Sequence, residues 1–352
     1  AVLIASADPE VRTVDLEGRR PSTVWVHGGA VHRMALDPGG IELATASRDD
    51  TVAVGRLDGS TSASVGDAEA VPVRRLPLGG SVYGAAYHPS GSPLAVHSFG
   101  GRLGLWSFDD PEPRLLLGPE AVAEAWGRDV HVSGVAFDPG GRLWLRTGEG
   151  ELGRFELDVE KATLTAVGEP WAAGFAYFSI SRDGRRLAGN LGSTEVAVYD
   201  LSRDDVWPPP RVWGATFESR RLSRPAWSVD GRRLAVPFDA AVRVFDLDGG
   251  DEPITVLGHG DMVSTVALLE DGRLLSGSLD GTVRLWRTDL RDPQAELRRR
   301  TEACLAPGDR RRLLLETEAQ AQRGHLKCAA RRGLSAGPGA SGPARVSTKS
   351  SF

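Results

Sequence analysis

Residues 276–286, "SGSLDGTVRLW", decide how this chain folds. Apolar and polar residues alternate on both sides of the Leu-Asp-Gly turn, a pattern that predicts two short strands joined by a hairpin. The stretch also holds Ser, Asp and Trp, and His259 stands upstream. Ser, His and Asp together can form a nucleophilic site, or a buried hydrogen-bond network without chemistry. The choice depends on whether the pattern occurs once or many times.

The pattern repeats along most of the chain. Turn tetrapeptides recur about every 40 to 50 residues, the period of a propeller blade. They are DPGG at 37–40, HPSG at 88–91, DPGG at 138–141, SRDG at 181–184, SVDG at 228–231 and LEDG at 269–272. Each turn follows one alternating run and precedes two more, and a weaker fourth run precedes each unit. Four short strands per unit predict the four-stranded antiparallel blade of a β-propeller.

Counting the units gives six full ones and a partial one at residues 2–16. The sequence therefore predicts an all-β, seven-bladed β-propeller over residues 1–290, its first blade incomplete at the N-terminus and its last lacking a fourth strand. Because an open sheet edge is a pairing liability, we expect roughly 20–25 preceding residues, about half a repeat, to close the ring.

The repeats resemble the WD-repeat β-propeller family. The last unit carries Gly258 and His259, the run "MVSTVALL", the turn "EDGR", the stretch "SGSLDGTV", and Trp286 at the family's Trp position, with Arg287 in place of the family's Asp. The first full unit aligns with it without gaps, and the middle units are divergent. They resemble bacterial examples, in which such propellers often follow a nucleotide-switch ATPase or a Ser/Thr kinase in one chain.

The resemblance implies a structural role for the polar residues of the opening stretch. In the family a His, a Ser or Thr, the turn Asp and the Trp form a hydrogen-bonded chain inside the blade. The expected members here are His259, Ser276 or Ser278, Asp280 and Trp286 in the last blade, and His27, Thr45 or Ser47, and Asp49 in the first full unit, where Gly55 replaces the Trp. A buried Asp needs such donors, so this reading is favoured over catalysis.

Signatures of catalysis are absent from the sequence, which contains no Gly-x-Ser-x-Gly elbow, no Gly-Lys phosphate loop, no His-Glu-x-x-His and no Cys-x-x-Cys. We therefore expect no enzymatic activity, no metal and no cofactor. The alternative is an enzymatic propeller, a hydrolase or lactonase, with its site in the central channel. It would need three or more inward-facing Asp, Glu, His or Asn side chains around an ion.

One end of the propeller is the expected partner surface. In the family the turn between second and third strands reaches the top face, and the residue before the turn Asp points outward. Those residues are Arg48, Phe99, Gly148, Gly192, Phe238 and Leu279. Arg48, Phe99, Phe238 and Leu279 are predicted to bind a protein or peptide, with ordinary turn residues as the alternative. A second candidate is the Pro-rich loop at 204–213, whose Trp207 and Trp213 either face a partner or pack onto the blade.

Residues 291–352 differ in charge from the rest of the chain. A basic end follows an acidic body, although the whole chain carries a net charge of −5. Asp292 followed by Pro293 predicts a helix start, and a second helix is expected over 309–332, interrupted or ended near Gly324. Residues 291–333 are thus a basic helical extension, and 334–352 a disordered tail. The extension has no aromatic residue for base stacking, so nucleic acid is not expected.

The remaining composition bears on the setting. Two Cys, 304 and 328, cannot make a disulfide framework. They are expected to be small apolar or bridging residues of the extension, with a redox or metal-binding role as the alternative. No apolar run approaches a membrane span, so a cytoplasmic location without membrane contact is expected. The sequence thus predicts a non-enzymatic interaction scaffold or sensor propeller, the C-terminal part of a larger bacterial signalling protein, with a possible intramolecular contact to an upstream domain.

Overall fold

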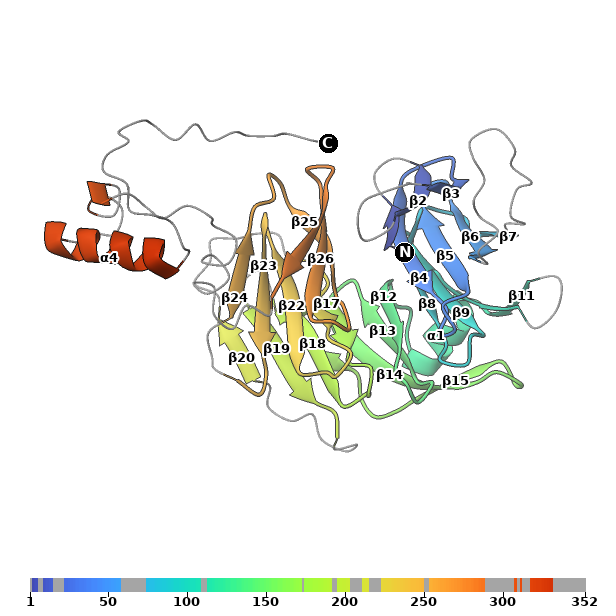
Figure 1. Ribbon diagram of the computed structural model, residues 1–352. Helices are drawn as coiled ribbons and strands as arrows, with labels where there is room; N and C mark the ends of the chain where they lie inside the picture. Colours follow the sequence, from blue (N-terminus) through green and yellow to red (C-terminus); the bar gives the residue numbers. More distant parts are fainter. Residues whose placement is uncertain are drawn as a thin grey trace. The chain divides into compact units, whose positions relative to one another are not determined.

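The computed structural model describes residues 2–5, 9–14, 22–57, 74–108, 113–172, 174–191, 195–202, 211–214, 223–249, 253–288, 307–308, 311 and 317–331. The chain divides into two compact units, residues 1–289 and 290–352. The first unit is built of strands and the second contains a helix (Figure 1).

Seven antiparallel sheets follow one another along the first unit. Sheet 1 holds β1 (Val2–Ala5), β2 (Glu10–Val14) and β3 (Ser22–Val26). Sheet 2 holds β4 (Val31–Leu36), β5 (Glu42–Ser47), β6 (Thr51–Arg56) and β7 (Arg74–Pro77). Sheet 3 holds β8 (Val82–Tyr87), β9 (Leu94–Ser98), β10 (Leu103–Ser107) and β11 (Arg114–Leu117). Sheet 4 holds β12 (Val132–Phe137), β13 (Leu143–Thr147), β14 (Glu151–Asp158), β15 (Thr163–Ala166) and the short β16 (Trp171–Ala172).

Sheet 5 holds β17 (Phe175–Ile180), β18 (Arg186–Leu191), β19 (Glu195–Asp200) and β20 (Arg211–Gly214). Sheet 6 holds β21 (Ala226–Trp227), β22 (Arg233–Phe238), β23 (Ala241–Asp246) and β24 (Ile254–Leu257). Sheet 7 holds β25 (Val263–Leu268), β26 (Arg273–Ser278) and β27 (Val283–Arg287). The strands of each sheet pair in chain order, as consecutive hairpins require, except that β16 pairs with β14.

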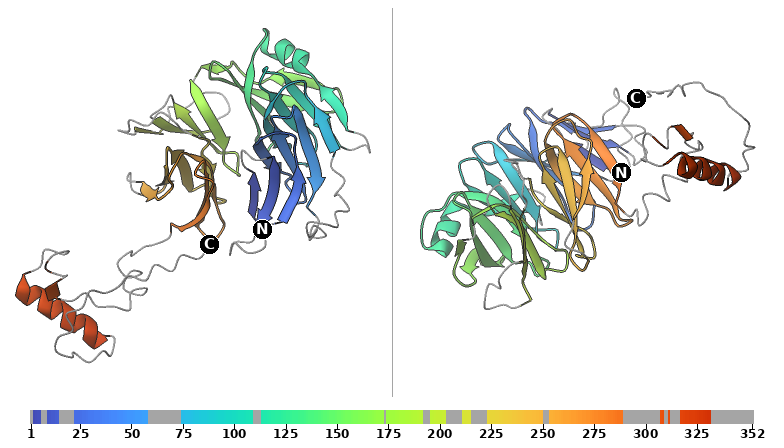
Figure 2. Two further views of the ribbon diagram at one scale, coloured as in Figure 1. Left: turned by 90° about the horizontal axis from the view of Figure 1, so that it is seen from above. Right: turned by 90° about the vertical axis from the view of Figure 1, so that its left-hand side faces the viewer.

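The sheets are arranged around a common axis (Figure 2). The first strand of each sheet contacts that of the next: β4 with β8, β8 with β12, β12 with β17, β17 with β21, and β21 with β25. These strands therefore form the inner edge, and the fourth strands form the periphery. The structure confirms the all-β, seven-bladed prediction, with three described strands in each of sheets 1 and 7.

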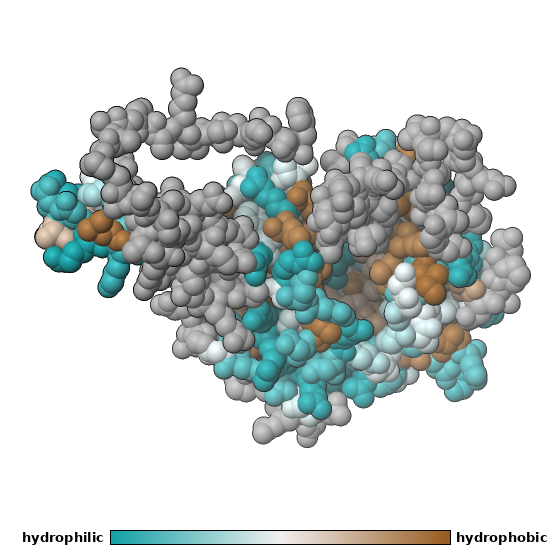
Figure 3. Space-filling view, viewed as in Figure 1, coloured by the Kyte–Doolittle hydropathy of each residue, from teal (hydrophilic) through white to brown (hydrophobic). Residues whose placement is uncertain are grey.

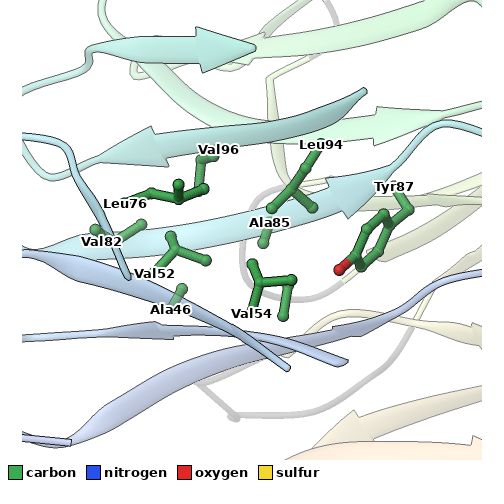
Figure 4. Packing of buried hydrophobic residues seen from close by; sticks show 10 residues of the cluster. Ala46, Val52, Val54, Leu76, Val82, Ala85, Tyr87, Leu94 and Val96 are labelled. Carbon is green, nitrogen blue, oxygen red and sulfur yellow. The ribbon is translucent and has the colours of Figure 1, made fainter. Parts of the chain in front are cut away.

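Apolar side chains fill the space between neighbouring sheets. Val52 and Val54 of β6 pack with Val82, Leu94 and Val96 of sheet 3, all fully buried, and the side chains lie between the two ribbons in Figure 4. Burying a Val or Leu side chain contributes about 1.5–3 kcal/mol. This interface repeats from sheet to sheet, so the alternating runs of the sequence have their apolar faces against a neighbour.

One helix of the first unit has no counterpart in the sequence-based expectation. Helix α1 (Pro119–Trp126) lies between β11 and β12, with Pro119 in its first turn and Gly127 closing it at φ 74°. Proline near the start and left-handed glycine after the end are ordinary helix boundaries. Val122 is buried, and the ring of Trp126 lies 5.1 Å from that of Phe155. The helix thus covers the outer part of sheet 4.

The second unit contains helix α4 (Glu318–Arg331). The expectation of a break near Gly324 is wrong, because the helix continues through that residue. An interior glycine costs about 1 kcal/mol, and the surrounding Ala, Gln, Lys and Arg residues favour the helix. The helix expected after Asp292 and the tail at 334–352 lie outside the described residues. Across the described part of the chain, no helix has both the length and the apolar character of a membrane span.

Candidate functional site

Sheet 7 brings together the four side chains that the opening stretch singled out. The Trp286 indole N–H donates to Ser276 Oγ at 2.7 Å, and the Ser276 hydroxyl donates to His259 Nε2 at 2.7 Å. The Nδ1–H of His259 donates to Asp280 Oδ2 at 2.9 Å. Ser278 instead bonds to the Asp261 carbonyl and receives the N–H of Asp280. The hydroxyl in this Trp–hydroxyl–His–Asp network is therefore that of Ser276.

Sheet 2 has the same network with its Trp supplied from elsewhere. Thr45 Oγ1 donates to His27 Nε2 at 2.7 Å, and His27 Nδ1–H donates to Asp49 Oδ2 at 2.9 Å. The indole N–H that reaches Thr45, at 2.9 Å, belongs to Trp25 on β3 of sheet 1. A Cβ on Gly55 would lie 2.9 Å from the Trp25 ring, so Gly55 leaves the space that the ring fills.

The sequence-based assignment missed Trp25. The signal was available, because a glycine at the Trp position stands in one unit with a Trp two residues before the His. Since Trp25 belongs to sheet 1 and bonds to sheet 2, the network here also fixes two neighbouring sheets to each other. Ser47, the alternative hydroxyl, donates to the Gly29 carbonyl instead.

The electrostatics suit a neutral His between a hydroxyl and a carboxylate. Burial lowers the pKa of His27 despite the neighbouring Asp49. Burial would raise the pKa of Asp49, but hydrogen bonds from Thr51, the Gly28 N–H and His27 outweigh it and hold that pKa well below its usual value. Hydrogen bonds from Thr282 and the Gly260 N–H likewise lower the pKa of Asp280. In sheet 2 a neutral imidazole thus donates to an ionised Asp, and Asp280 of sheet 7 is ionised as well.

Ser276, His259 and Asp280 have the connectivity of a Ser-His-Asp triad but lack access for a substrate. Ser276 is 1% exposed, and its oxygen already accepts the Trp286 N–H. A nucleophile must reach an electrophilic carbon, and a side chain enclosed in the blade offers a substrate no approach. The arrangement is enclosed in the blade, where its hydrogen bonds join three strand and loop segments of sheet 7. Among the described residues, no group of three or more His, Cys, Asp or Glu side chains could hold a metal ion.

The turns between second and third strands lie beside the loops that lead into the first strands. The N–H groups of Arg48, Phe99, Gly148 and Leu279 donate to the carbonyls of Ala30, Ser81, His131 and Met262, respectively. These turns and loops together form one end of the propeller, here called the top face. Arg48 and Gly148 are exposed, Phe99 is 70% exposed and Leu279 is 55% exposed.

Phe238 does not belong to this surface, and the expectation that it points outward is wrong. Its side chain is only 5% exposed and packs with Leu234, Val236 and Phe245. The reason is the length of its turn. Phe238 is the last residue of β22 and pairs with Ala241 across a two-residue connection, whereas Phe99 and Leu279 lie within longer turns beyond their strands. Gly192 and Trp207 lie outside the described residues, as does the side chain of Trp213.

The top face carries a continuous row of aromatic rings across sheets 2 and 3. His32 and Tyr83 stack with ring centroids 4.3 Å apart, and Tyr83 lies 5.7 Å from Phe99. All three side chains are exposed. Burial and the neighbouring Arg48 guanidinium lower the pKa of His32. Here the row of His32, Tyr83 and Phe99 with Arg48 beside it is called the aromatic row. His32 and Tyr83 occupy the same position of successive first strands, a repeat that could have revealed them.

Known proteins match this architecture at three levels. A WD domain, G-beta repeat, matches residues 251–287, which include the complete network of sheet 7. Residues 251–287 therefore match one WD repeat, and the chain has the fold of a seven-bladed β-propeller. A WD repeat-containing protein of Synechocystis is 32% identical over 111 residues, 31% of this chain and 30% of the relative's length. The crystal structure of the Cps50 (Swd1) β-propeller domain of Myceliophteria thermophila superposes with a TM-score of 0.61 at 17% identity, covering 81% of this chain and 92% of that domain.

These similarities support the β-propeller fold of this chain. The aligned stretch spans less than a third of the Synechocystis relative, which itself is uncharacterised, and the Cps50 propeller is similar in fold. WD-repeat propellers are generally protein-interaction scaffolds, which typically bind proteins or peptides.

Proposed function

We propose that this WD-repeat propeller is a non-enzymatic interaction module that binds a protein or peptide segment on its top face. The observation that carries the proposal is the aromatic row. Aromatic and arginine side chains dominate the binding energy of protein interfaces. A row of three exposed rings beside an exposed guanidinium is suited to an apolar anchor next to a carboxylate.

The rigidity of the scaffold supports this assignment. Phe99 lies in a turn and Tyr83 in the adjacent strand β8. The Phe99 N–H donates to the Ser81 carbonyl at 2.7 Å, and His131 Nε2 donates to the Phe99 carbonyl at 2.9 Å, so the backbone of the turn is fixed. Side chains held in this way lose little conformational entropy when a partner binds. Exposed aromatic rings in a stacked row on a fixed backbone are therefore an efficient binding surface.

The wider setting belongs to the same proposal. We place the propeller in the cytoplasm, as a regulatory or sensing part of a larger bacterial signalling protein with a nucleotide-switch ATPase or Ser/Thr kinase upstream. In that arrangement a segment of the upstream domain is one candidate ligand of the top face.

The test is a selection of peptides on the purified chain. A displayed peptide library is panned against it, and binding of the enriched peptides is measured calorimetrically. Phe99→Ser should weaken binding about tenfold or more, the loss of a hot-spot residue. Ile41→Ser is the control, because Ile41 is also an exposed apolar residue but lies in the turn between β4 and β5, at the other end of the sheet. Equal affinities for the two variants would refute the proposal.

A further inference from the structure

The residues at the inner edge of the propeller form complementary pairs. In sheets 2, 3, 4 and 7 the third residue of the first strand pairs with a residue near the end of the second strand. In each pair one side chain is larger than the other. The registered pairs are Arg33 with Ala46, Gly84 with His97, Gly134 with Arg146, and Thr265 with Gly277. A backbone irregularity follows the start of each of these first strands, which re-aims the side chain there.

At two of these glycines, the absence of a Cβ leaves space for a polar side chain of the neighbouring strand. A Cβ on Gly84 would lie 2.2 Å from His97 Nε2, and one on Gly134 would lie 3.4 Å from Arg146 Nε. The imidazole of His97 and the guanidinium of Arg146 thus pass over the first strand toward the inner side of the sheet. In sheet 5 the third residue of the first strand is Tyr177, and in sheet 6 Arg224 precedes the first strand by two residues.

These side chains converge on the axis although they start from five different sheets. Burial, and then the charges of Arg224, Arg146 and Arg33, lower the pKa of His97 to about 3. Burial, and then Arg33 and Arg146, lower the pKa of Arg224 well below its usual value, with Tyr177 opposing. Arg33, Arg146 and Arg224 belong to sheets 2, 4 and 6. Groups on alternate sheets can affect one another in this way only around the common axis.

No carboxylate compensates this cluster among the described residues. Arg146 donates to the Phe175 carbonyl at 3.0 Å and to the Ser133 carbonyl at 3.2 Å. The side chain of Arg33 makes no hydrogen bond or ion pair within that part of the chain, and the buried Nε of Arg224 has no acceptor. His97, 5% exposed, has an unpartnered Nδ1. Buried donors without acceptors are costly, so an anionic acceptor bound here would stabilise the cluster.

We propose that the axis of the propeller binds a small multivalent oxyanion of the phosphate class, held by Arg33, Arg146 and Arg224. The planar guanidinium fork matches phosphate oxygens, and three arginines on alternate sheets approach such a group from three sides. A single carboxylate would leave most of the positive charge unpaired. Tyr177, from sheet 5, supplies a phenolic O–H to the same site.

The site differs from what a hydrolytic propeller would need. A metal-dependent hydrolase requires carboxylates or histidines around an ion, whereas the axial groups described here are three arginines with one buried imidazole. The same three arginines would repel a divalent cation. The axial anion is therefore a ligand that stabilises the propeller, separate from the top face of the interaction proposal.

The experiment measures thermal unfolding and calorimetric binding of the full chain with millimolar inorganic phosphate or pyrophosphate against chloride of equal ionic strength. We expect saturable binding and a rise in Tm of about 3 °C or more at saturation. In Arg33→Met and in Arg224→Met the phosphate-dependent rise should disappear, while Tm without phosphate should stay the same or increase because an uncompensated charge is removed. Arg182→Met, at an exposed turn of sheet 5, should keep the full response.

The results separate the possible outcomes. An equal rise in the two axial variants and in Arg182→Met, or no effect beyond that of chloride in the unchanged chain, would overturn the proposal. A phosphoserine peptide is the third ligand tested. If it binds while phosphate and pyrophosphate do not, the ligand is protein-borne and the free-anion proposal is wrong.

Discussion

Replacing Thr45 by Val tests the network that joins sheets 1 and 2. The two side chains have nearly the same shape, so the change removes the hydroxyl and little packing. In the structure that hydroxyl accepts the Trp25 N–H at 2.9 Å and donates to His27 Nε2 at 2.7 Å. Thr45 itself is completely buried, and Trp25 and His27 are buried around it. The substitution therefore leaves two buried polar groups without partners.

The magnitude follows from that count. A buried group that loses its partner costs about 1–3 kcal/mol, so the two losses together destabilise the propeller by about 2–6 kcal/mol. A second consequence is specific to the network. Trp25→Phe removes one of the two orphaned groups in advance, and the double variant should therefore be less destabilised than the sum of the single variants, by about 1 kcal/mol or more.

The assay is urea unfolding followed by intrinsic fluorescence, with the change in midpoint read at an unchanged m-value. Thr163→Val is the control, since Thr163 is an exposed residue of β15, and should change stability by less than about 0.5 kcal/mol. A Thr45→Val chain as stable as the control, or additive effects of Thr45→Val and Trp25→Phe, would contradict the reasoning.

Three further predictions address other contacts. Gly84→Ala should destabilise the chain by about 1–3 kcal/mol, because its methyl group would lie 2.2 Å from His97 Nε2, and His97→Ala should rescue it; a Tm unchanged by Gly84→Ala would show that the imidazole can move aside. Folding lowers the pKa of His97 to about 3, so the unfolded chain binds a proton at higher pH than the folded chain does. The free energy of unfolding should therefore fall as pH decreases from about 6.5 toward 3. His97→Gln should reduce this loss in urea titrations across that range, and equal pH profiles of the two chains would count against it. The lowered pKa of Asp49 gives stability that is present above about pH 4 and lost below it. Asp49→Asn should be less stable than the parent at pH 7, and its stability should depend less on pH below about pH 4. An unchanged pH dependence in that acid range would argue against this role of Asp49.

The repeat made most of the fold predictable. Four alternating runs and a turn in each unit reflect one physical requirement, an apolar face against each neighbouring sheet, and the structure has a strand at nearly every such run. The network of sheet 7 could be assigned because all four residues stand in one repeat. Helix α1 replaces a loop in a single unit, so the repeat could not predict it. Only Pro119 at its start and Gly127 after its end mark the helix in the sequence.

The remaining errors have local causes. Trp25 was missed because it bonds to the sheet after its own, a contact that no spacing within one repeat describes. Phe238 was misplaced because its turn is shorter than those of Phe99 and Leu279, so that the side chain stays in the strand pattern. The axial arginines were not singled out because they do not recur at one position of the repeat. Arg33 is on a first strand and Arg146 on a second strand. Only the pairing of Arg146 with Gly134, the residue equivalent to Arg33, shows that the two side chains lie at the same level of their sheets.

The hydrogen bonds between consecutive sheets determine how local unfolding of one sheet affects the others. The N–H groups that begin sheets 4, 5 and 7 donate to turn carbonyls of the preceding sheets, at Gly101, Gly150 and Asp239. Each sheet is therefore held chiefly by the two beside it, as in other chains of nearest-neighbour units. Loss of one sheet lowers hydrogen-exchange protection in its neighbours first, and distant sheets keep theirs. Such locality tolerates sequence drift, so a middle unit without the Trp–hydroxyl–His–Asp network can persist between well-ordered neighbours.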